Sequence, residues 1–581
     1  MTFEQASLLI LLVVMLVLFS LDRVRIEVVA IAGLLAGYVL GLYPAAQVFA
    51  GFASPVVITV VEILLIVQVL ARAKLFDRLA DIFSRAKFSN AAVIATLSAA
   101  AGFISIFMND IGAFSIALPA ALRISASLAI PRRQLIMPIS FAALLGGLVS
   151  LIGTPANLLV SNALAEATGS GLHLFDFAYV GLPVAIAGIA LTAWLAPRLF
   201  PQTSNEPASP SGVPRRVLTE RRVPAHSTLV GNRLSDLPAM FALLPHSLVR
   251  NERFVFGKPE SAVIEAGDLL LAEMDDVVLA ELLASGVLLA PPRFGPPPSR
   301  PIHIEAVVMP ESTLLGSRLR SIEVFKAHDI TISALSMRSP RIEGRFEDLQ
   351  LSIGDILILE GDREAIRQAL EECECLPLAT SPAAPGAVTS LLPFAIFAVG
   401  VASTAFNLLT PDIGFAGVIL ALALLNYLNI RQAMADLNWP IIIMLGAMIP
   451  IGSAVASTGT AQLIATALGL IIPLAEPIAG VALVLFLAMV LTPFVNNATV
   501  AIIMSPIALQ FAAAGHHVPQ AYMIAVAAGA SLDFLTPFGH HNNTLAMGIG
   551  SYRFVDFLKA GAPLTLLSYV LTTLLIYVFW L

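Results

Sequence analysis

Two long stretches rich in apolar residues, from residue 4 to 198 and from about residue 390 to 580, flank a more polar central segment. The first stretch contains apolar runs of membrane-spanning length, which predict five transmembrane helices. These runs are 4–20, 25–43, 53–71, 134–165 (interrupted) and 178–198. Between the third and fourth runs lie two shorter apolar arms, 92–107 and 112–125. Because these short arms meet at a polar tip, they predict a re-entrant hairpin.

The second stretch repeats the first at a spacing of 387 residues. Phe107-Met108-Asn109-Asp110 recurs as Phe494-Val495-Asn496-Asn497, and a proline follows ten residues after the first Asn of each, at Pro119 and Pro506. Around the last helix, Asp176-Phe177, Gly181 and Pro183 match Asp556-Phe557, Gly561 and Pro563. Adding 387 to the first three runs gives further apolar runs, and a second pair of arms follows them. The ranges are 391–407, 412–430 and 440–458, with arms at 478–494 and 499–513.

Basic residues are distributed oppositely in the two repeats, which fixes their orientation through the positive-inside rule. In the first repeat they follow the third helix and the hairpin: Arg72, Lys74, Arg78, Arg85 and Lys87, then Arg123, Arg132 and Arg133. The equivalent segments of the second repeat, 459–474 and 514–520, contain no Lys or Arg. At the last helix the bias is reversed, with Arg553 and Lys559 in the second repeat only. We therefore expect an inverted repeat in the cell (inner) membrane, with both termini outside and residues 199–388 in the cytoplasm.

Composition narrows the class of protein. The chain has 581 residues, of which 58% are hydrophobic and 12% charged, as expected for a polytopic α-helical membrane protein. Lys and Arg total 32 against 39 Asp and Glu, so we expect no nucleic-acid partner. Cys373 and Cys375 form a Cys-x-Cys pair without a nearby Cys or His cluster, so neither a disulfide framework nor a metal site is expected. No nucleophile–base set, metal cluster or phosphate loop predicts an enzyme.

Each repeat is interrupted twice by polar residues inside apolar segments. The hairpin tips are Asn109-Asp110-Ile111-Gly112 and Asn496-Asn497-Ala498-Thr499, and the later helix breaks are 150–157 and 536–544. A hydrocarbon core cannot satisfy free backbone groups, so such breaks line a protein-enclosed cavity. Exposed helix N-termini attract an anion, whereas carbonyl, Asn and Thr oxygens suit a small hard cation such as Na⁺. We therefore expect the four interruptions to form one transport site.

The four phrases around these interruptions resemble the divalent anion:sodium symporters, the family of dicarboxylate, citrate and sulfate carriers. The phrases are FMNDIGAFSIALP, LIGTPANLLVSNAL, FVNNATVAIIMSP and FLTPFGHHNNTLAMGIGSYRF. The resemblance implies homodimers that move a transport domain in an elevator-type mechanism, coupled to Na⁺ and without a covalent cofactor. The substrate-binding positions that it implies are Asn109, Asp110, Asn496, Asn497, Thr499, Thr154, His540 and Asn542. The candidate Na⁺ ligands are Asn109, Asp110, Gly153, Asn157, Asn496, Asn497, Gly539 and Asn543.

Three positions depart from the Ser-Asn-Thr type of motif in that family. Asp110 stands where the motif has Asn, and Ile111 and Ala498 stand where it has Thr. A carboxylate beside the site repels a dianion unless a proton or cation neutralises it. This departure leaves H⁺ coupling and other anions open. The alternatives are a cation- or proton-coupled exchanger, a ligand-gated membrane sensor and a channel.

The central segment is itself duplicated. Ser227-Thr228-Leu229-Val230-Gly231-Asn232-Arg233-Leu234 recurs 85 residues later, at 312–319, and Gly267-Asp268 recurs as Gly354-Asp355. Each copy resembles the TrkA C-terminal domain, a small α+β module that dimerises and in some proteins binds a nucleotide. The expected chain order is as follows: membrane repeat 1 at 1–198 (hairpin 92–125), linker 199–217, module 1 at 218–290, Pro-rich linker 291–300, module 2 at 301–377, linker 378–388 and membrane repeat 2 at 389–581 (hairpin 478–513).

Overall fold

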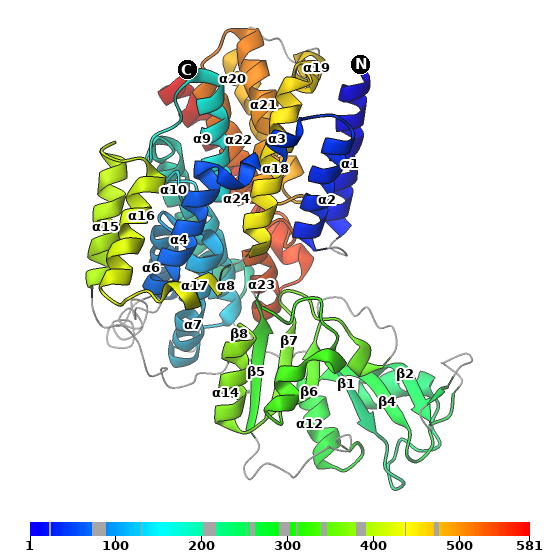
Figure 1. The fold of residues 1–581 in the computed structure, drawn as a ribbon. Helices are drawn as coiled ribbons and strands as arrows, with labels where there is room; N and C mark the ends of the chain where they lie inside the picture. The colour runs from blue at the N-terminus through cyan, green and yellow to red at the C-terminus, as the bar shows by residue number, and fades with distance from the viewer. Residues whose placement is uncertain are drawn as a thin grey trace. The chain divides into compact units, whose positions relative to one another are not determined.

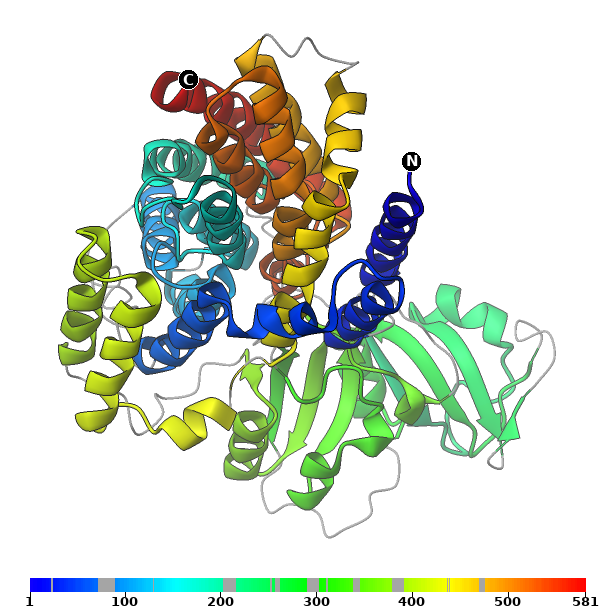
Figure 2. The ribbon, with the colours of Figure 1, turned by 45° about the horizontal axis from the view of Figure 1, so that its top comes forward.

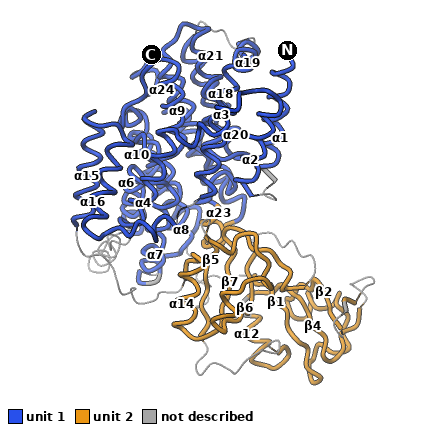
Figure 3. The backbone as a smooth tube through the Cα atoms, in the orientation of Figure 1, with its two compact units in different colours: residues 1–201, 384–543, 553–581 blue, residues 202–383, 544–552 orange. Residues whose placement is uncertain are grey.

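The chain forms two compact units in a computed structural model (Figure 3). Unit 1 comprises residues 1–201, 384–543 and 553–581, and unit 2 comprises residues 202–383 and 544–552. The structure describes residues 1–21, 25–71, 89–128, 130–201, 216–250, 253–255, 262–289, 302–309, 312–337, 345–378, 391–435, 437, 439–469 and 476–581. The basic cluster at 72–87, most of the two linkers at 199–217 and 378–388, and the linker at 291–300 lie outside the described residues.

Unit 1 has a helix at every apolar run that the sequence predicts (Figure 1). In the first stretch the helices are α1 (Phe3–Leu21), α2 (Ile26–Val39), α3 (Ala45–Val48), α4 (Pro55–Ala71), α6 (Asn90–Ser105), α7 (Asp110–Leu128), α8 (Arg132–Gly147), α9 (Pro155–Thr168) and α10 (Ala178–Leu199). The interruption predicted within 134–165 is the segment between α8 and α9. Pro155 at the first turn of α9 suits that position, because proline lacks the N–H that a helix start leaves unpaired.

The second stretch follows the same order. Its helices are α15 (Leu392–Ala405), α16 (Pro411–Leu424), α17 (Ile430–Ala435), α18 (Trp439–Ser457), α19 (Thr460–Gly469), α20 (Pro477–Leu491), α21 (Asn497–Gly515), α22 (Pro519–Ser531), α23 (His541–Gly550) and α24 (Phe554–Trp580). The short helices α17 and α19 are additions that the apolar pattern did not predict. The second helix break is the segment between α22 and α23.

The second arm of each hairpin is longer than the sequence predicted. Both α7 and α21 have 19 residues, because each begins at the polar tip and continues past the apolar run. Among the described helices, α10, α18, α21 and α24 are long and apolar enough to cross a membrane. The sequence argument that both arms are too short to cross the membrane is therefore wrong for α21. The polar tip is the remaining argument for a re-entrant hairpin, which stays a prediction.

Helices α10 and α24, which hold matching positions in the two repeats, pack against each other in antiparallel directions. Tyr179, at the start of α10, has its ring centroid 5.5 Å from that of Phe579, near the end of α24. At the opposite end, Arg133 at the start of α8 forms an ion pair with Asp556 at the start of α24. The Gln134 side chain donates to the carbonyl of Phe200, which follows α10, at 2.6 Å. The end of α10 and the starts of α8 and α24 therefore lie at the same end of unit 1.

One glycine in each of these two helices permits a close contact with a helix break. A Cβ atom on Gly181 would lie 2.2 Å from the carbonyl oxygen of Leu148, and a Cβ atom on Gly561 would lie 2.0 Å from that of Phe534. Leu148 and Phe534 are themselves matching residues, each just after the helix that precedes its break. No side chain fits at either glycine, so the repeated Gly-x-Pro sequence reflects a repeated contact.

Unit 2 contains one sheet that runs through both copies of the duplicated sequence (Figures 1 and 2). The first copy contributes β1 (Arg216–Arg222), β2 (Leu244–Arg250), β3 (Arg253–Phe254), β4 (Leu269–Asp275) and helix α12 (Asp276–Ala284). The second contributes β5 (Ile302–Val308), β6 (Thr331–Ser336), β7 (Ile356–Gly361), β8 (Cys375–Pro377) and helix α14 (Arg363–Glu372). Among the described residues the strand order is β3-β2-β4-β1-β6-β7-β5-β8, with antiparallel pairing throughout.

The two copies in unit 2 have the same strand order, β2-β4-β1 in the first and β6-β7-β5 in the second. They join where Leu218 of β1 pairs with Leu335 of β6. The repeated glycines explain part of the duplicated sequence, because Gly231 and Gly316 have φ of +87° and +74°, a region that favours glycine. Arg233 and Arg318 form matching backbone bridges, with Val263 and Gln350, and neither side chain forms an ion pair with another described residue.

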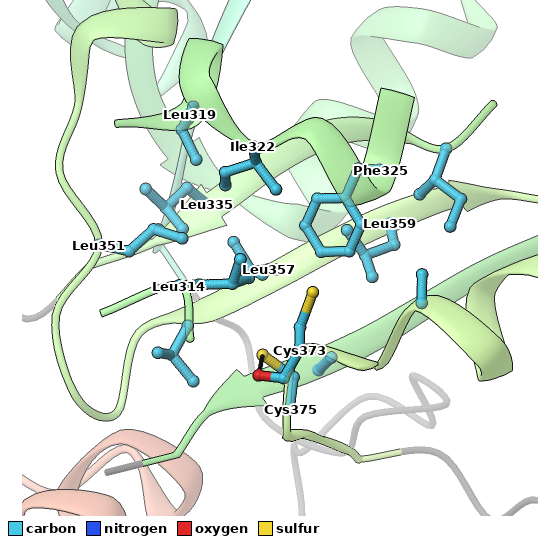
Figure 4. Close-up of a cluster of buried hydrophobic side chains, with 14 of the residues drawn as sticks. Leu314, Leu319, Ile322, Phe325, Leu335, Leu351, Leu357, Leu359, Cys373 and Cys375 are labelled. Atoms are coloured by element: carbon cyan, nitrogen blue, oxygen red, sulfur yellow. Dashed lines mark hydrogen bonds between the residues drawn. The ribbon is translucent and has the colours of Figure 1, made fainter. Parts of the chain in front are cut away.

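Cys373 and Cys375 are free thiols in the hydrophobic core of the second copy, beside residues such as Leu357 and Phe325 (Figure 4). Burial raises the pKa of Cys373 to about 11 and that of Cys375 to about 12. The Sγ atom of Cys375 lies 3.3 Å from the hydroxyl of Ser312. The described residues contain no group of three or more His, Cys, Asp or Glu that could hold a metal ion. The two thiols are therefore part of the core.

These thiols are expected to resist alkylation in the folded protein. At pH 7.5 the reactive thiolate would make up less than about 0.1% of either cysteine, and the core shields both sulfur atoms. Iodoacetamide followed by mass spectrometry should find both residues unmodified until a denaturant is added. Rapid labelling of the native protein at pH 7.5 would contradict this packing.

Candidate functional site

The two hairpin tips cap the helices that follow them in a similar way. In the first tip, the N–H of Ile111 donates to the side-chain oxygens of Asn109, at 3.3 Å, and of Asp110, at 3.0 Å. In the second tip, the N–H of Thr499 donates to Asn496 at 2.9 Å, and the N–H of Ala498 donates to Asn497 at 2.9 Å. The predicted tip residues therefore lie at the N-termini of α7 and α21, where each side-chain oxygen satisfies a free N–H.

The two helix breaks are held by matching asparagines, 386 residues apart in the sequence. The amide nitrogen of Asn157 donates to the carbonyls of Gly147 and Ser150, at 3.0 and 2.7 Å. The amide nitrogen of Asn543 donates to the carbonyls of Asp533 and Thr536, at 3.0 and 3.3 Å. Each asparagine therefore ties the start of one helix to free carbonyls at or just after the end of the preceding helix, which pairs polar groups that are costly to bury unpaired.

Three other predicted residues of the breaks, Thr154, Gly153 and Gly539, have structural roles. Thr154 is the N-cap of α9, where its hydroxyl accepts the N–H of Asn157 at 3.4 Å. Gly153 and Gly539 allow close backbone approach, since a Cβ atom would lie 2.5 Å from the carbonyl oxygen of Gly147 in the first case and 1.8 Å from Oδ2 of Asp533 in the second.

The tips and breaks meet. Within the first repeat, the hydroxyl of Ser150 donates to the carbonyl of Ile106, just before the first tip. Within the second repeat, Gly539 lies against Pro493, just before the second tip. Between the repeats, Nδ1 of His540 lies 3.7 Å from Oδ2 of Asp110, and both side chains are buried. The second arm α21 also packs against α9. The tip of one repeat is therefore in contact with the break of the other.

Several buried polar atoms at these interruptions lack a hydrogen-bond partner among the described residues. They are both amide atoms of Asn542, the hydroxyl of Thr499 and the amide oxygen of Asn157. Asn542 and Asn157 are completely buried, and Thr499 is 1% exposed. An unpaired polar group is costly in such a place, which favours a ligand as its partner. Amide and hydroxyl donors suit an anion, and amide oxygens suit a hard cation.

Sequence reasoning missed two residues of this site. Asp533 is 2% exposed, and its Oδ2 accepts the hydroxyl of Thr536 at 3.1 Å. It could have been found as the one carboxylate between Glu476 and Asp556. Ser140, on α8 of the first repeat, donates to Oδ1 of Asn543 in the second at 2.9 Å. No local signal identifies Ser140, because its partner lies 403 residues away.

The comparisons with known proteins place the chain among transporters. A model of the citrate transporter family, CitMHS, matches residues 16–529. The chain is 27% identical to the uncharacterized transporter sll0640 of Synechocystis, over 97% of this chain and 95% of that protein. It is 28% identical to the uncharacterized transporter YfbS of Escherichia coli, over 96% of each chain. It is also 24% identical to sodium/sulfate cotransporter 2 of Chlamydomonas reinhardtii, over 44% of this chain and 32% of that protein.

Proposed function

Because this chain belongs to the citrate transporter family, and is thus a membrane transport protein and not an enzyme, we propose that it is a secondary active carrier of a small anion. The substrate belongs to the sulfate or di- and tricarboxylate class, and a Na⁺ gradient drives its movement. The names of the sodium/sulfate cotransporters among its relatives support both parts of this proposal. H⁺ is the alternative coupling ion.

The observation that carries the proposal is the pair of buried, unpaired donors at Asn542 and Thr499. Both residues lie in the first turn of a helix, α23 and α21 respectively, where free N–H groups and the helix dipole also favour negative charge. Amide, hydroxyl and backbone donors together can replace the hydration of a sulfate or carboxylate group without a fixed positive charge. A site of this kind releases its substrate, as a carrier must.

An inverted repeat is the architecture that we propose for unit 1. The antiparallel packing of α10 against α24 supports it, because equivalent helices in inverted repeats run in opposite directions. The starts of α8 and α24 and the end of α10 lie together, which supports the proposed orientation of the two repeats in the membrane. The positive-inside rule assigns both Arg133 and the start of α24 to the cytoplasmic side, and the Arg133–Asp556 ion pair joins them. On this basis both termini are outside and residues 199–388 are cytoplasmic.

Two further parts of the proposal rest on the family resemblance. One is an elevator-type movement of the interruptions against a fixed scaffold in a homodimer within the lipid bilayer. The other is that unit 2 consists of two TrkA C-terminal modules, which either bind a small regulatory ligand such as a nucleotide or serve only in dimerisation. The identical strand order of its two copies supports a tandem pair of modules.

Uptake by proteoliposomes tests the carrier proposal. The full-length protein should accumulate at least one of radiolabelled sulfate, succinate and citrate above equilibrium when a Na⁺ gradient is imposed. Accumulation under a H⁺ gradient alone would identify H⁺ as the coupling ion. Absence of uptake of all three anions under either gradient would contradict the proposal.

Asp110→Asn is expected to uncouple uptake from the gradient while anion binding remains. The carboxylate of Asp110 is the charged group of the first tip, and its contact with His540 joins the two repeats. Asparagine preserves the shape and the oxygen that accepts the Ile111 N–H. Accumulation should therefore fall to the equilibrium level, about tenfold or more below the wild type, with anion affinity changed by less than about threefold. A variant that still concentrates the anion would show that Asp110 only tunes the site.

A further inference from the structure

Glu62 is a buried acid that lies outside the four interruptions. It is near the middle of α4 and 7% exposed, and its Oε2 atom has no hydrogen-bond partner among the described residues. A polar group buried without a partner destabilises the fold, and a charged group does so more strongly. An acid kept inside a membrane helix therefore indicates a function, and the proposed anion site does not use this one.

The second repeat shows that the fold does not require an acid at this position. Position 62 matches Ile449 on α18 through the spacing of 387 residues. The two helices have matching neighbours, because α4 packs against α16 while α18 packs against α2, the helix that matches α16 (Figure 1). Ile449 has no polar side-chain atom. Packing between these helices therefore does not account for the carboxyl group of Glu62.

A second acid, Asp412 in the first turn of α16, acts on Glu62 through its charge. Of the other helices that pack most closely against α4, α15 and α18 carry no ionisable group. The groups on the remaining ones are Asp110 and Arg123 on α7, Glu166 on α9 and Arg431 on α17. Asp412 is only half-buried, and the free N–H groups at the start of α16 favour its negative charge. That charge attracts a proton to Glu62.

A proton is the cation that suits Glu62. A hard metal ion takes about six oxygen ligands. Glu62 offers one unpartnered oxygen, and the described residues contain no group of three or more metal-binding side chains. A proton needs one oxygen, and it removes the charge that makes burial so unfavourable. Two neighbouring carboxyl groups can hold one proton between them, and burial favours the neutral form at Glu62.

We propose that Glu62 is a proton-binding site at the contact between α4 and α16, which takes up a proton when these helices pack together and releases it in alkaline solution. Because α4 belongs to the first repeat and α16 to the second, the bound proton helps to hold the two repeats together. Its loss leaves two negative charges near each other across the contact. The inference goes beyond the proposed function, since it depends on neither the anion nor the coupling ion.

Infrared difference spectroscopy of the full-length protein in detergent tests this site. Glu62→Gln keeps the size of the side chain and cannot ionise. The buried carboxyl groups of Asp110 and Asp533 are present in both proteins, so their bands cancel. The difference between the wild type and Glu62→Gln should contain the carbonyl band of a protonated carboxylic acid at about pH 6, and this band should be lost by about pH 10. In Asp412→Asn the band should be lost at a lower pH, because the attracting charge is gone.

The melting temperature provides a second measurement. Between about pH 6 and pH 10 the wild type should lose about 5 °C more than Glu62→Gln, since only the wild type gains an unpaired buried charge at Glu62. Glu62→Leu, which introduces an apolar side chain like that of Ile449, should lose as little as Glu62→Gln. It takes the place of Glu62→Gln in both measurements if that variant fails to fold.

Three results would overturn the inference. If the band is missing at about pH 6, Glu62 is already charged in the folded protein. If the band persists at about pH 10, and the wild type and Glu62→Gln lose equal amounts of melting temperature, Glu62 never releases its proton. If the band disappears at the same pH in the wild type and in Asp412→Asn, the proton does not depend on the second repeat.

Discussion

Asn542→Leu is expected to abolish anion accumulation without unfolding the protein. Neither amide atom of Asn542 has a partner among the described residues, so replacement by an apolar side chain of similar size removes an unpaired polar group from a buried position. Stability should stay the same or increase by up to about 2 kcal/mol. The substrate would lose one or two charge-assisted hydrogen bonds, which corresponds to a fall in uptake of about 100-fold.

The neighbouring residue provides the control. Asn543→Leu removes the two hydrogen bonds that hold the break together and leaves the hydroxyl of Ser140 without its acceptor. This variant should lose about 2–4 kcal/mol of stability. Melting temperatures in detergent and labelled-anion uptake in proteoliposomes compare the two. If Asn542→Leu lowers the melting temperature as much as Asn543→Leu does, Asn542 holds the structure together and is not a substrate contact.

Gly561→Val is expected to prevent α24 from packing against the second helix break. The Cβ atom would fall 2.0 Å from the carbonyl oxygen of Phe534, and that oxygen belongs to backbone that cannot move aside cheaply. Overpacking of this kind costs about 3 kcal/mol or more, because the helix must withdraw along its length. Detergent-extracted protein should show a lower melting temperature and little uptake.

Two other glycines provide a comparison and a control for this prediction. Gly181→Val should have a comparable effect in the first repeat, since its Cβ atom would lie 2.2 Å from the carbonyl of Leu148. Gly417→Ala, on α16, places a Cβ atom where nothing lies within 4 Å, and should leave stability unchanged or raise it by about 0.5–1 kcal/mol. A tolerated valine at both Gly181 and Gly561 would contradict the close approach that we describe.

The positions of the helices and of the four interruptions could be predicted from the sequence because each depends on local signals. Apolar runs specify membrane helices, and residues such as Asn109, Pro155 and Asn496 mark where helices begin. The exact ends of a hairpin arm depend on more than its run of apolar residues. Helix α21 extends to Asn497 because Asn496 caps it, which made the apolar run 499–513 too short as a guide to its length.

The assembly of the site could not be predicted in the same way. The contacts between Asp110 and His540, and between Ser140 and Asn543, join residues more than 400 positions apart. No local sequence pattern indicates either of these contacts. The asymmetry of the breaks is visible in the sequence only when matching positions are compared, as for Asp533 with Gly147. The comparison acquires meaning once the structure shows that Asn157 and Asn543 hold equivalent positions.

The joint between β1 and β6 has a consequence for the handling of this protein. Because the first copy offers its β1 edge and the second its β6 edge, the pairing is head-to-tail, and such pairing can continue without limit. Two short strands end the series, β3 beside β2 and β8 beside β5. A truncation that removes Cys375–Pro377 would uncover the edge of β5. Because β3 still covers β2, only a form that lacks both end strands would offer two complementary edges and polymerise into ribbons through its sheet, so expression designs should retain both.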